Sequence, residues 1–207
     1  MQITKTKNVY IDKMAMVALS ALLVAVFVVF NRFLSIRTPI VIISFSFVPV
    51  MVAAFVMGRW WAALVAGLGD FIGAMLWPFG TFFFGFTLSW ILSGIIYGEF
   101  LYHAKERNKK DRWLLANVII SSIIVLFTMT MFLNTYWLYV MWDRAFWPTA
   151  GTRAIASAIM TPIQIVAMFL ILKFLREPVE KFLVQSNADN DPDPEEIIKT
   201  EETNDKT

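Results

Sequence analysis

Three charged side chains interrupt long apolar runs and could bind a solute: the carboxylate of Asp70 and the guanidinium groups of Arg32 and Arg153. A charge inside a bilayer is costly and requires a partner or a water-filled cavity. A guanidinium binds a carboxylate with two parallel hydrogen bonds, and an aspartate can accept two N–H bonds from an aminopyrimidine edge. These residues predict a polar pocket for a small molecule. An internal ion pair for Asp70, and interfacial anchoring for the arginines, are the alternative interpretations.

Aromatic residues are dense near the same charges. One group is Trp77, Phe79, Phe82, Phe83, Phe84 and Phe86, and a second is Tyr136, Trp137, Tyr139, Trp142 and Trp147. A belt at the membrane interface explains most of them. The faces of the others can stack on a flat ring. An acid, arginines and ring faces together suit a flat heterocycle that carries carboxylates. The uncharged connection at 77–83 is also a candidate inward-folding lid.

Motifs for catalysis and metal binding are missing from the sequence. It has no cysteine and a single histidine, His103, which argues against thiolate metal sites and histidine-dependent hydrolases. It contains no phosphate-binding loop, no H-E-x-x-H and no G-x-S-x-G. The net charge of +2 gives no ground for a nucleic-acid partner. We therefore expect neither an enzyme nor a cofactor held by this chain.

Membrane helices are the elements that must position these residues. The 207 residues are 58% hydrophobic and 16% charged, with a mean hydropathy of +0.63, whereas soluble domains are about 25% charged. Six apolar runs reach the roughly 17–25 residues that cross a bilayer. They are 13–33, 40–57, 60–76, 84–102, 113–142 and 153–175. Their continuous character makes strands unexpected. The predicted fold class is an all-α integral membrane protein with six transmembrane helices.

Composition also predicts the boundaries of the domain. Residues 1–12 form a short N-terminal segment, and 13–186 form one six-helix membrane substrate-binding domain. Residues 187–207 contain eight acidic residues and no aromatic residue, which is typical of a disordered tail. Within the domain, we expect Pro148 and Gly151 to break the chain between the last two helices.

The placement of lysine and arginine predicts the orientation. Twelve lie on one side of the predicted helices: Lys5, Lys7, Lys13, Arg59, Lys105, Arg107, Lys109, Lys110, Arg112, Lys173, Arg176 and Lys181. Four lie on the other: Arg32, Arg37, Arg144 and Arg153. Both termini are therefore expected in the cytoplasm, with the protein in the cell membrane. Asp70 then lies about 16 Å from the cytoplasmic end of its helix, so the pocket should open to the outside.

Several motifs resemble those of the folate-family substrate-binding subunits (S components) of energy-coupling factor (ECF) transporters. The most specific is the Gly-Phe-Thr-Leu-Ser run at 85–89, and the resemblance covers residues 13–176. The other matching stretches are 31–36, 67–73, 77–80, 94–98, 134–138, and Arg153 with 160–164. Phe83 stands where this resemblance leads us to expect a proline.

The resemblance implies a six-helix fold with both termini inside. It also implies capture of folate or a reduced folate from the outside of a bacterial plasma membrane. Its expected partners are a transmembrane coupling subunit, the T component, and two cytoplasmic ATPases that use ATP. The family's Ala-x-x-x-Ala motif maps onto Ala21 and Ala25, which would face the coupling subunit.

Taken together, these features predict a set of substrate-binding residues. Asp70 would read the edge of the heterocycle, and Arg153, helped by Arg32, would hold a carboxylate. The full set is Arg32, Asp70, Phe84, Gly85, Phe86, Thr87, Asn134, Trp137 and Arg153. The alternatives are another vitamin, pterin or pyrimidine precursor on the same architecture, an autonomous secondary transporter, or a membrane scaffold.

Overall fold

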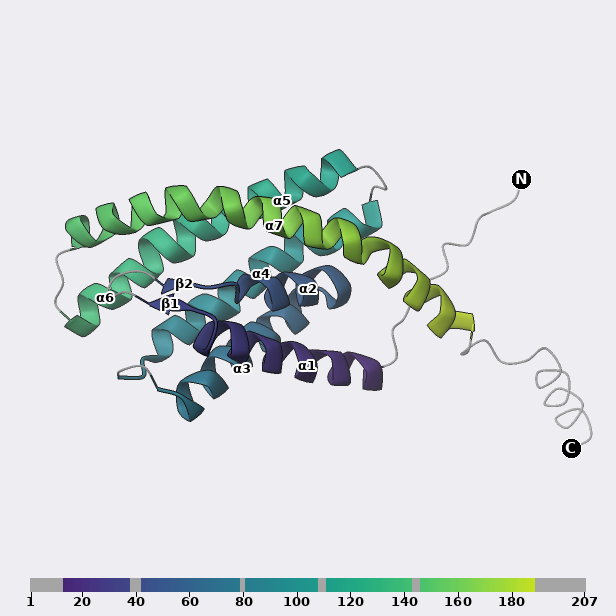
Figure 1. Cartoon of the computed structure of the whole chain (residues 1–207), viewed down its shortest axis with the longest axis horizontal. Coiled ribbons are helices and arrows are strands. Elements are labelled where there is room, and N and C mark those ends of the chain that lie inside the picture. Colours follow the sequence, from purple (N-terminus) through teal and green to yellow (C-terminus); the bar gives the residue numbers. More distant parts are fainter. Residues whose placement is uncertain (1–12, 38–41, 79–80, 108–110, 143–145, 189–207) are drawn as a thin grey trace, which may run out of the picture.

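The computed structural model describes residues 13–37, 42–78, 81–107, 111–142 and 146–188, which form a bundle of helices with one small strand pair (Figure 1). The helices are α1 (Lys13–Arg32), α2 (Phe47–Met57), α3 (Arg59–Leu76), α4 (Phe84–Arg107), α5 (Asp111–Val125), the π-helix η1 (Leu126–Leu133), α6 (Asn134–Trp142) and α7 (Phe146–Ala188). The strands are β1 (Ile36–Arg37) and β2 (Ile42–Ile43). The predicted helical fold is confirmed, and the acidic residues 189–207 lie outside the described part of the chain.

Four of the described helical stretches are long and apolar enough to cross a membrane. They are Met14–Arg32, Phe84–Tyr102, Asp111–Met141 and Phe146–Glu177. The two longest exceed the ~30 Å hydrocarbon core at about 1.5 Å per residue, so they must tilt or project beyond it. These lengths and compositions support an integral membrane protein. A total of six crossings stays a prediction.

The second predicted run, 40–57, is not helical throughout. Its helix α2 has only 11 residues, and Ile42–Ile43 is the strand β2. This strand pairs antiparallel with β1, so that Ile36 lies opposite Ile43. The expectation of no strands is therefore wrong at this point. The strand residues Ile36, Ile42 and Ile43 are β-branched, which favours extended backbone.

The predicted break at 147–151 is also wrong, because α7 already begins at Phe146 and runs for 43 residues. Pro148 is the third residue of this helix, where the missing N–H has no intrahelical carbonyl to bond. Gly151 is exposed within the helix. The fifth predicted run is helical from Asp111 to Trp142, although eight of its residues, Leu126–Leu133, form the π-helix η1.

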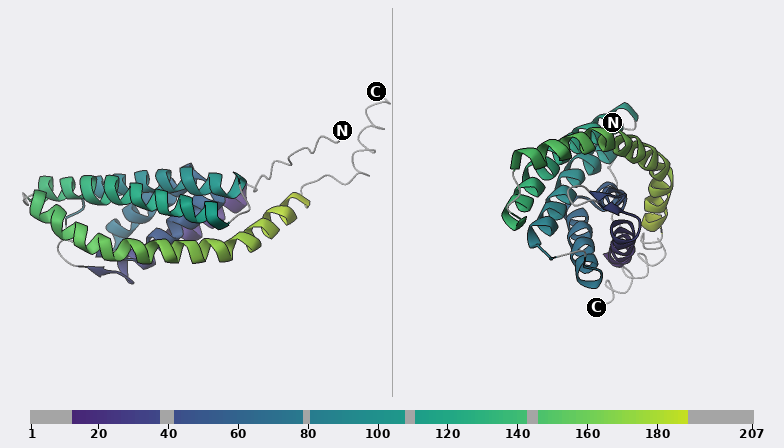
Figure 2. Two further views of the ribbon diagram at one scale, coloured as in Figure 1. Left: turned by 90° about the horizontal axis from the view of Figure 1, so that it is seen from above. Right: turned by 60° about the vertical axis from the view of Figure 1, so that its left-hand side comes forward.

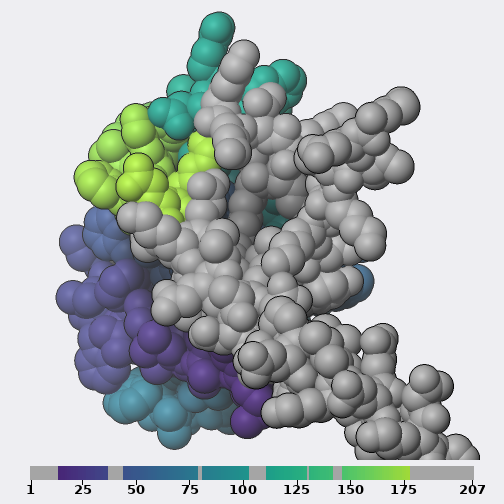
Figure 3. Space-filling view, turned by 90° about the vertical axis from the view of Figure 1, so that its right-hand side faces the viewer, coloured from purple at the N-terminus to yellow at the C-terminus, as the bar shows by residue number. Residues whose placement is uncertain are grey.

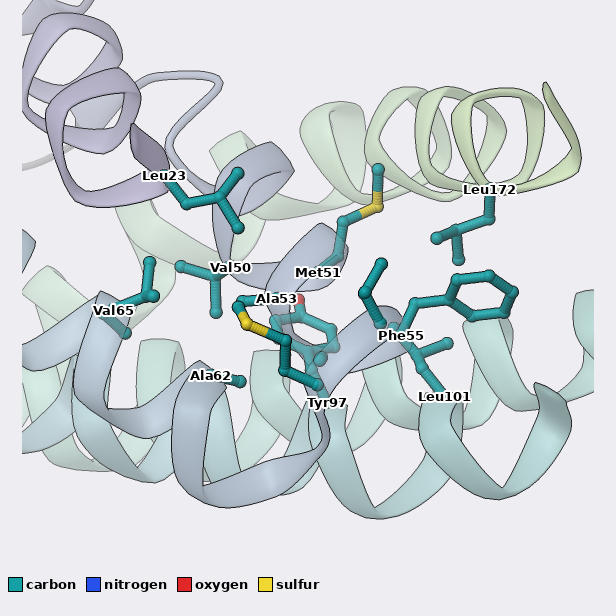
Figure 4. Close-up of a cluster of buried hydrophobic side chains, with 14 of the residues drawn as sticks. Leu23, Val50, Met51, Ala53, Phe55, Ala62, Val65, Tyr97, Leu101 and Leu172 are labelled. Atoms are coloured by element: carbon teal, nitrogen blue, oxygen red, sulfur yellow. The ribbon is translucent and has the colours of Figure 1, made fainter. Parts of the chain in front are cut away.

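The hydrophobic core is built around the short helix α2, which contacts α1, α3, α4 and α7. Figure 4 shows its side chains pointing into the space between these helices. Labelled there are Leu23, Val50, Met51, Ala53, Phe55, Ala62, Val65, Tyr97, Leu101 and Leu172, all buried. Because α2 meets four helices, its apolar side chains hold α1, α3, α4 and α7 together.

The helix ends define two ends of the molecule. α1 begins and α7 ends at one end, on the right of Figure 1, whereas α6 and the start of α7 lie at the other. Figure 2 shows α7 running along the full length of the other helices. Figure 3 looks onto the end where α1, in purple, and α7, in yellow-green, come to the surface. The first and last described helices therefore place their outer ends on the same side of the bundle.

Two glycines of α4 let α3 approach closely. A Cβ at Gly94 would lie 2.6 Å from the carbonyl oxygen of Ala62, and one at Gly98 would overlap the backbone of Arg59. Such contacts have no room for a side chain, and they allow the two helix backbones to pack tightly. This contact holds α3, and with it Asp70, against α4.

We expect Gly98→Ala to destabilise the protein by about 1–3 kcal/mol, because the added methyl group must push α3 away from α4. Gly151→Ala is the matched control, since nothing lies within 4 Å of its Cβ position on α7. Helix propensity predicts that this control is neutral or stabilising by up to about 1 kcal/mol. Thermal unfolding in detergent measures both, and equal melting temperatures for the two variants would contradict the packing described.

Candidate ligand-binding site

Asp70 of α3 is the centre of a buried polar contact between three helices. Its Oδ2 accepts a hydrogen bond of 2.7 Å from Thr87 Oγ1 of α4. Its Oδ1 lies 3.8 Å from Nη2 of Arg32, at the end of α1. The same Arg32 nitrogen donates to the backbone oxygen of Asp70 at 3.4 Å. The side chains of Arg32 and Asp70 are only 7% and 10% exposed, so the charges compensate each other away from water.

Two glycines of α3 make room for this arrangement. A Cβ at Gly73 would lie 2.8 Å from Nε of Arg32, and one at Gly69 would lie 2.5 Å from the ring of Phe27. The two glycines are one helical turn apart on α3, so they form a smooth face against which α1 packs. The Gly-x-x-x-Gly pattern thus allows the guanidinium of Arg32 to lie across α3 beside Asp70.

A second contact group surrounds Trp137 of α6. Its indole Nε1 donates to Ser89 Oγ of α4 at 3.1 Å. A Cβ at Gly85 would lie 2.7 Å from the indole ring, so only glycine leaves the space that Trp137 occupies. Phe83 packs against Trp137 with ring centroids 5.5 Å apart, and against Phe86 with centroids 6.1 Å apart. The start of α4 therefore holds the aromatic group as well as Asp70.

A pocket of about 570 Å³ adjoins this aromatic group. It is lined by Phe132, Leu133, Tyr136, Trp137 and Phe146, from η1, α6 and α7. It is an open depression rather than an enclosed cavity, since Phe132 and Tyr136 are 60% and 50% exposed, and its lining is almost entirely apolar. Its lining offers ring faces and aliphatic carbon, and π-helical turns such as η1 are frequent at functional sites.

Asn134 begins α6 directly after the π-helix. Its Oδ1 is buried and meets no hydrogen-bond donor in the part of the chain that the structure describes. A buried oxygen without a donor is costly. The Oδ1 atom of Asn134 can therefore accept a hydrogen bond from a bound molecule.

The structure brings some of the predicted site residues together and not others. Arg32, Asp70 and Thr87 form one network, and Gly85, Phe86 and Trp137 belong to the aromatic group. Phe84 is 59% exposed and lies one turn from the exposed Leu88, so it faces away from both. Arg153 is half-buried near the start of α7, and the contacts given above do not include it.

Other predicted residues lie at the surface or outside the described residues. Ala21 and Ala25 are exposed on one face of α1. Phe79, of the candidate lid, and Arg144 fall outside the residues that the structure describes. The lid stays a prediction, although Trp77 and Phe82, on either side of the gap, contact Phe33 and Phe71 with ring centroids 5.2 and 5.9 Å apart.

Sequence reasoning gave no binding or positioning role to Ser89, and it treated Gly73 only as part of a Gly-x-x-x-Gly spacing that allows close helix approach. The signal for Ser89 was available, because it lies one turn after Gly85 in the most specific motif. Phe83 was placed in the aromatic group and at the position of an expected proline, but no partner was predicted for its ring. Its packing on Trp137 joins α4 to α6, a contact that no local pattern predicts.

The Thr87–Asp70 hydrogen bond gives the first test of this site. We expect Thr87→Val, which keeps the shape but removes the donor, to destabilise the protein by about 1–3 kcal/mol. Thr152→Val is the matched control, because its exposed hydroxyl donates only to Pro148 O of its own helix at 3.0 Å. Thermal unfolding compares the two, and a Thr87→Val variant as stable as the control would argue against the buried bond.

The chain is similar in sequence to known proteins. Folate transporter FolT of Clostridium novyi is 43% identical over 101 residues, which are 49% of this chain and 58% of that protein. Folate transporter FolT of Leuconostoc mesenteroides subsp. mesenteroides is 33% identical over 102 residues, which are 49% and 52% of the two chains. The chain therefore spans about half the length of these relatives.

A solved structure is similar as well. The crystal structure of FolT bound with folic acid matches with a TM-score of 0.66 and 32% identity, and the match covers 74% of this chain and 88% of that one. Residues 15–175 match the family described as the substrate-specific component of ECF transporters. Because this match extends from α1 into α7, the chain belongs to the family of ECF transporter substrate-specific components.

Proposed function

We propose that this protein is the membrane subunit that captures folate, or a reduced folate, for an ECF-type importer. The observation that carries the proposal is the 32% identity to FolT bound with folic acid, over 74% of this chain. A second support is chemical: Asp70 and Arg32 lie in contact between α1, α3 and α4, and the ring of Trp137 of α6 lies against α4. Folate combines an aminopyrimidine edge, flat rings and carboxylates, which are the groups these residues bind.

In this proposal, Asp70 reads the edge of the heterocycle. Its oxygens contact Thr87 and Arg32, but each carboxylate oxygen has two lone-pair directions and can accept a further N–H. The Arg32 guanidinium compensates the charge of Asp70 within a buried site, where hydrogen bonds to a ligand are strongest. Thr87 fixes the direction of the carboxylate.

The remaining residues take the rings and the carboxylates. Phe84, Phe86 and Trp137 pack against the ring faces, and Gly85 keeps the space that Trp137 needs. Asn134 donates or accepts hydrogen bonds through its amide group. Arg153, helped by Arg32, binds a carboxylate. Since Phe84 is 59% exposed here, its role requires a movement at the start of α4 when the ligand binds.

The orientation follows from the charge asymmetry of the sequence. We propose six membrane crossings with both termini in the cytoplasm, in the cell membrane of a bacterium. The start of α1 and the end of α7, which lie at one end of the bundle, support this topology (Figure 1). In this orientation, the Arg32–Asp70 and Trp137–Ser89 contacts lie towards the outside of the cell, from which a solute arrives.

The partners follow from the family. We propose a transmembrane coupling subunit, the T component, and two cytoplasmic ATPases that supply the energy, while this chain holds no cofactor. The exposed alanines Ala21 and Ala25 of α1 are the proposed docking face, because small residues allow close approach of another helix.

Removing the carboxylate tests the site. We expect Asp70→Ala to weaken folate binding by about ten- to a hundredfold, because the N–H groups of the heterocycle lose a charged acceptor worth about 1.5–3 kcal/mol. Glu99→Ala is the matched control, since Glu99 pairs with Arg59 on the surface at 2.8 Å. Titration of the purified protein, followed by tryptophan fluorescence, gives both affinities. Unchanged affinity in Asp70→Ala would remove Asp70 from the site.

Bulky residues on α1 test the docking face. We expect Ala21→Trp combined with Ala25→Trp to block folate uptake by cells that express the complete transporter, while folate binding stays as in the wild type. Ile159→Trp is the control, because Ile159 is 63% exposed on α7 and lies outside the proposed face. Uptake of radiolabelled folate measures the effect. Normal uptake by the double variant would reject docking through these alanines.

A further inference from the structure

We propose that Ser89 is a positioning residue, which orients the indole of Trp137 so that only its ring surface is presented to the ligand. The proposal rests on the function proposed above, because Trp137 is taken there as a ligand contact. It adds a residue outside the predicted binding set, and it specifies how Trp137 recognises its ligand: by stacking, without a hydrogen bond.

The contact joins two helices that are distant in sequence. Ser89 lies on α4 and is 3% exposed, and its Oγ accepts the hydrogen bond from Trp137 Nε1 of α6 at 3.1 Å. The indole nitrogen of tryptophan is a donor only and has a single hydrogen. Because Ser89 takes this hydrogen, Trp137 has no donor left for a ligand.

The Ser89 hydroxyl is itself fixed by its helix. Its hydrogen is donated to the backbone oxygen of Gly85, one turn earlier, at 3.1 Å. The lone pairs of the Ser89 oxygen therefore face away from that carbonyl and are available to Trp137. Gly85 leaves the space that the indole ring of Trp137 occupies, since a Cβ there would lie 2.7 Å from the ring. One turn of α4 thus supplies both the acceptor and the space.

The ring faces of Trp137 are the surfaces that remain for contact with a ligand. The residue lines the pocket of about 570 Å³, beside Tyr136 and Phe132. Ring centroids place Tyr136 at 5.2 Å and Phe83 at 5.5 Å from the indole. With its nitrogen bonded to Ser89 and its ring held among aromatic neighbours, Trp137 offers a flat surface to a flat ring.

Ser93 supplies a matched control. It is also buried, at 5% exposure, and it lies one turn further along α4. Its hydroxyl donates to the backbone oxygen of Ser89 at 2.8 Å, a bond within its own helix. Ser93→Ala therefore removes the same chemical group from the same helix without touching the indole of Trp137.

The first measurement needs no ligand. In protein labelled with ¹⁵N-tryptophan, the Trp137 indole signal is identified by its loss in Trp137→Phe. We expect Ser89→Ala to move this N–H signal upfield and to speed its exchange with water, because the hydrogen bond is lost. Ser93→Ala should leave it in place. An unchanged signal in Ser89→Ala, or equal shifts in both variants, overturns the proposal.

The second measurement is a double-mutant cycle on folate affinity. We expect Ser89→Ala to weaken binding about five- to tenfold, the effect of leaving one buried donor without its partner. In a Trp137→Phe background the same change should add less than about twofold, because the donor is already gone. Independent, multiplying losses would overturn the positioning role. A wild-type protein that binds no folate would instead refute the proposed function, while the indole signal still decides whether Ser89 orients Trp137.

Discussion

The buried carboxylate of Asp70 is the constraint on which the rest of the site depends. An ionised side chain within an apolar bundle needs a compensating charge and hydrogen bonds. Arg32 supplies the charge from the end of α1, and Thr87 supplies a hydrogen bond from α4. Three helices must therefore meet at one place. The glycines of α3 and α4 make the meeting possible, because they remove the side chains that would hold these helices apart.

The first turns of α4 link this charged centre to the aromatic one. Thr87 holds Asp70 of α3, while Gly85 and Ser89, one turn apart, hold Trp137 of α6. A short sequence motif thus fixes the relative position of two helices that approach α4 from different sides. This explains why the most specific stretch of the sequence is rich in small residues: its side chains position the binding groups of neighbouring helices.

Local patterns predicted the elements well, and contacts between elements less well. Hydropathy indicated the long helices, since it reports the lipid environment directly. It also extended the second run through Ile42, because it cannot distinguish an apolar strand from an apolar helix. Pro148 suggested a break, although proline fits the first turn of α7. For the site, Asp70 and Arg32 stood out as buried charges. An internal ion pair for Asp70 was the alternative interpretation of the sequence, and the structure does place Arg32 beside it. The identity of that partner, the contact of Trp137 with Ser89, and the outward direction of Phe84 depend on how helices cross, which composition does not encode.

Native mass spectrometry of the detergent-purified protein, as it comes from cells and after addition of folate, tests the central claim most directly. The paired acid and arginine, with aromatic rings held against the same helix α4, predict a complex of one folate-class molecule with one protein, which survives transfer from solution. A bound molecule of a different class would replace the substrate and keep the architecture. A protein that carries no pterin, and that stays free when folate is added, would contradict the account.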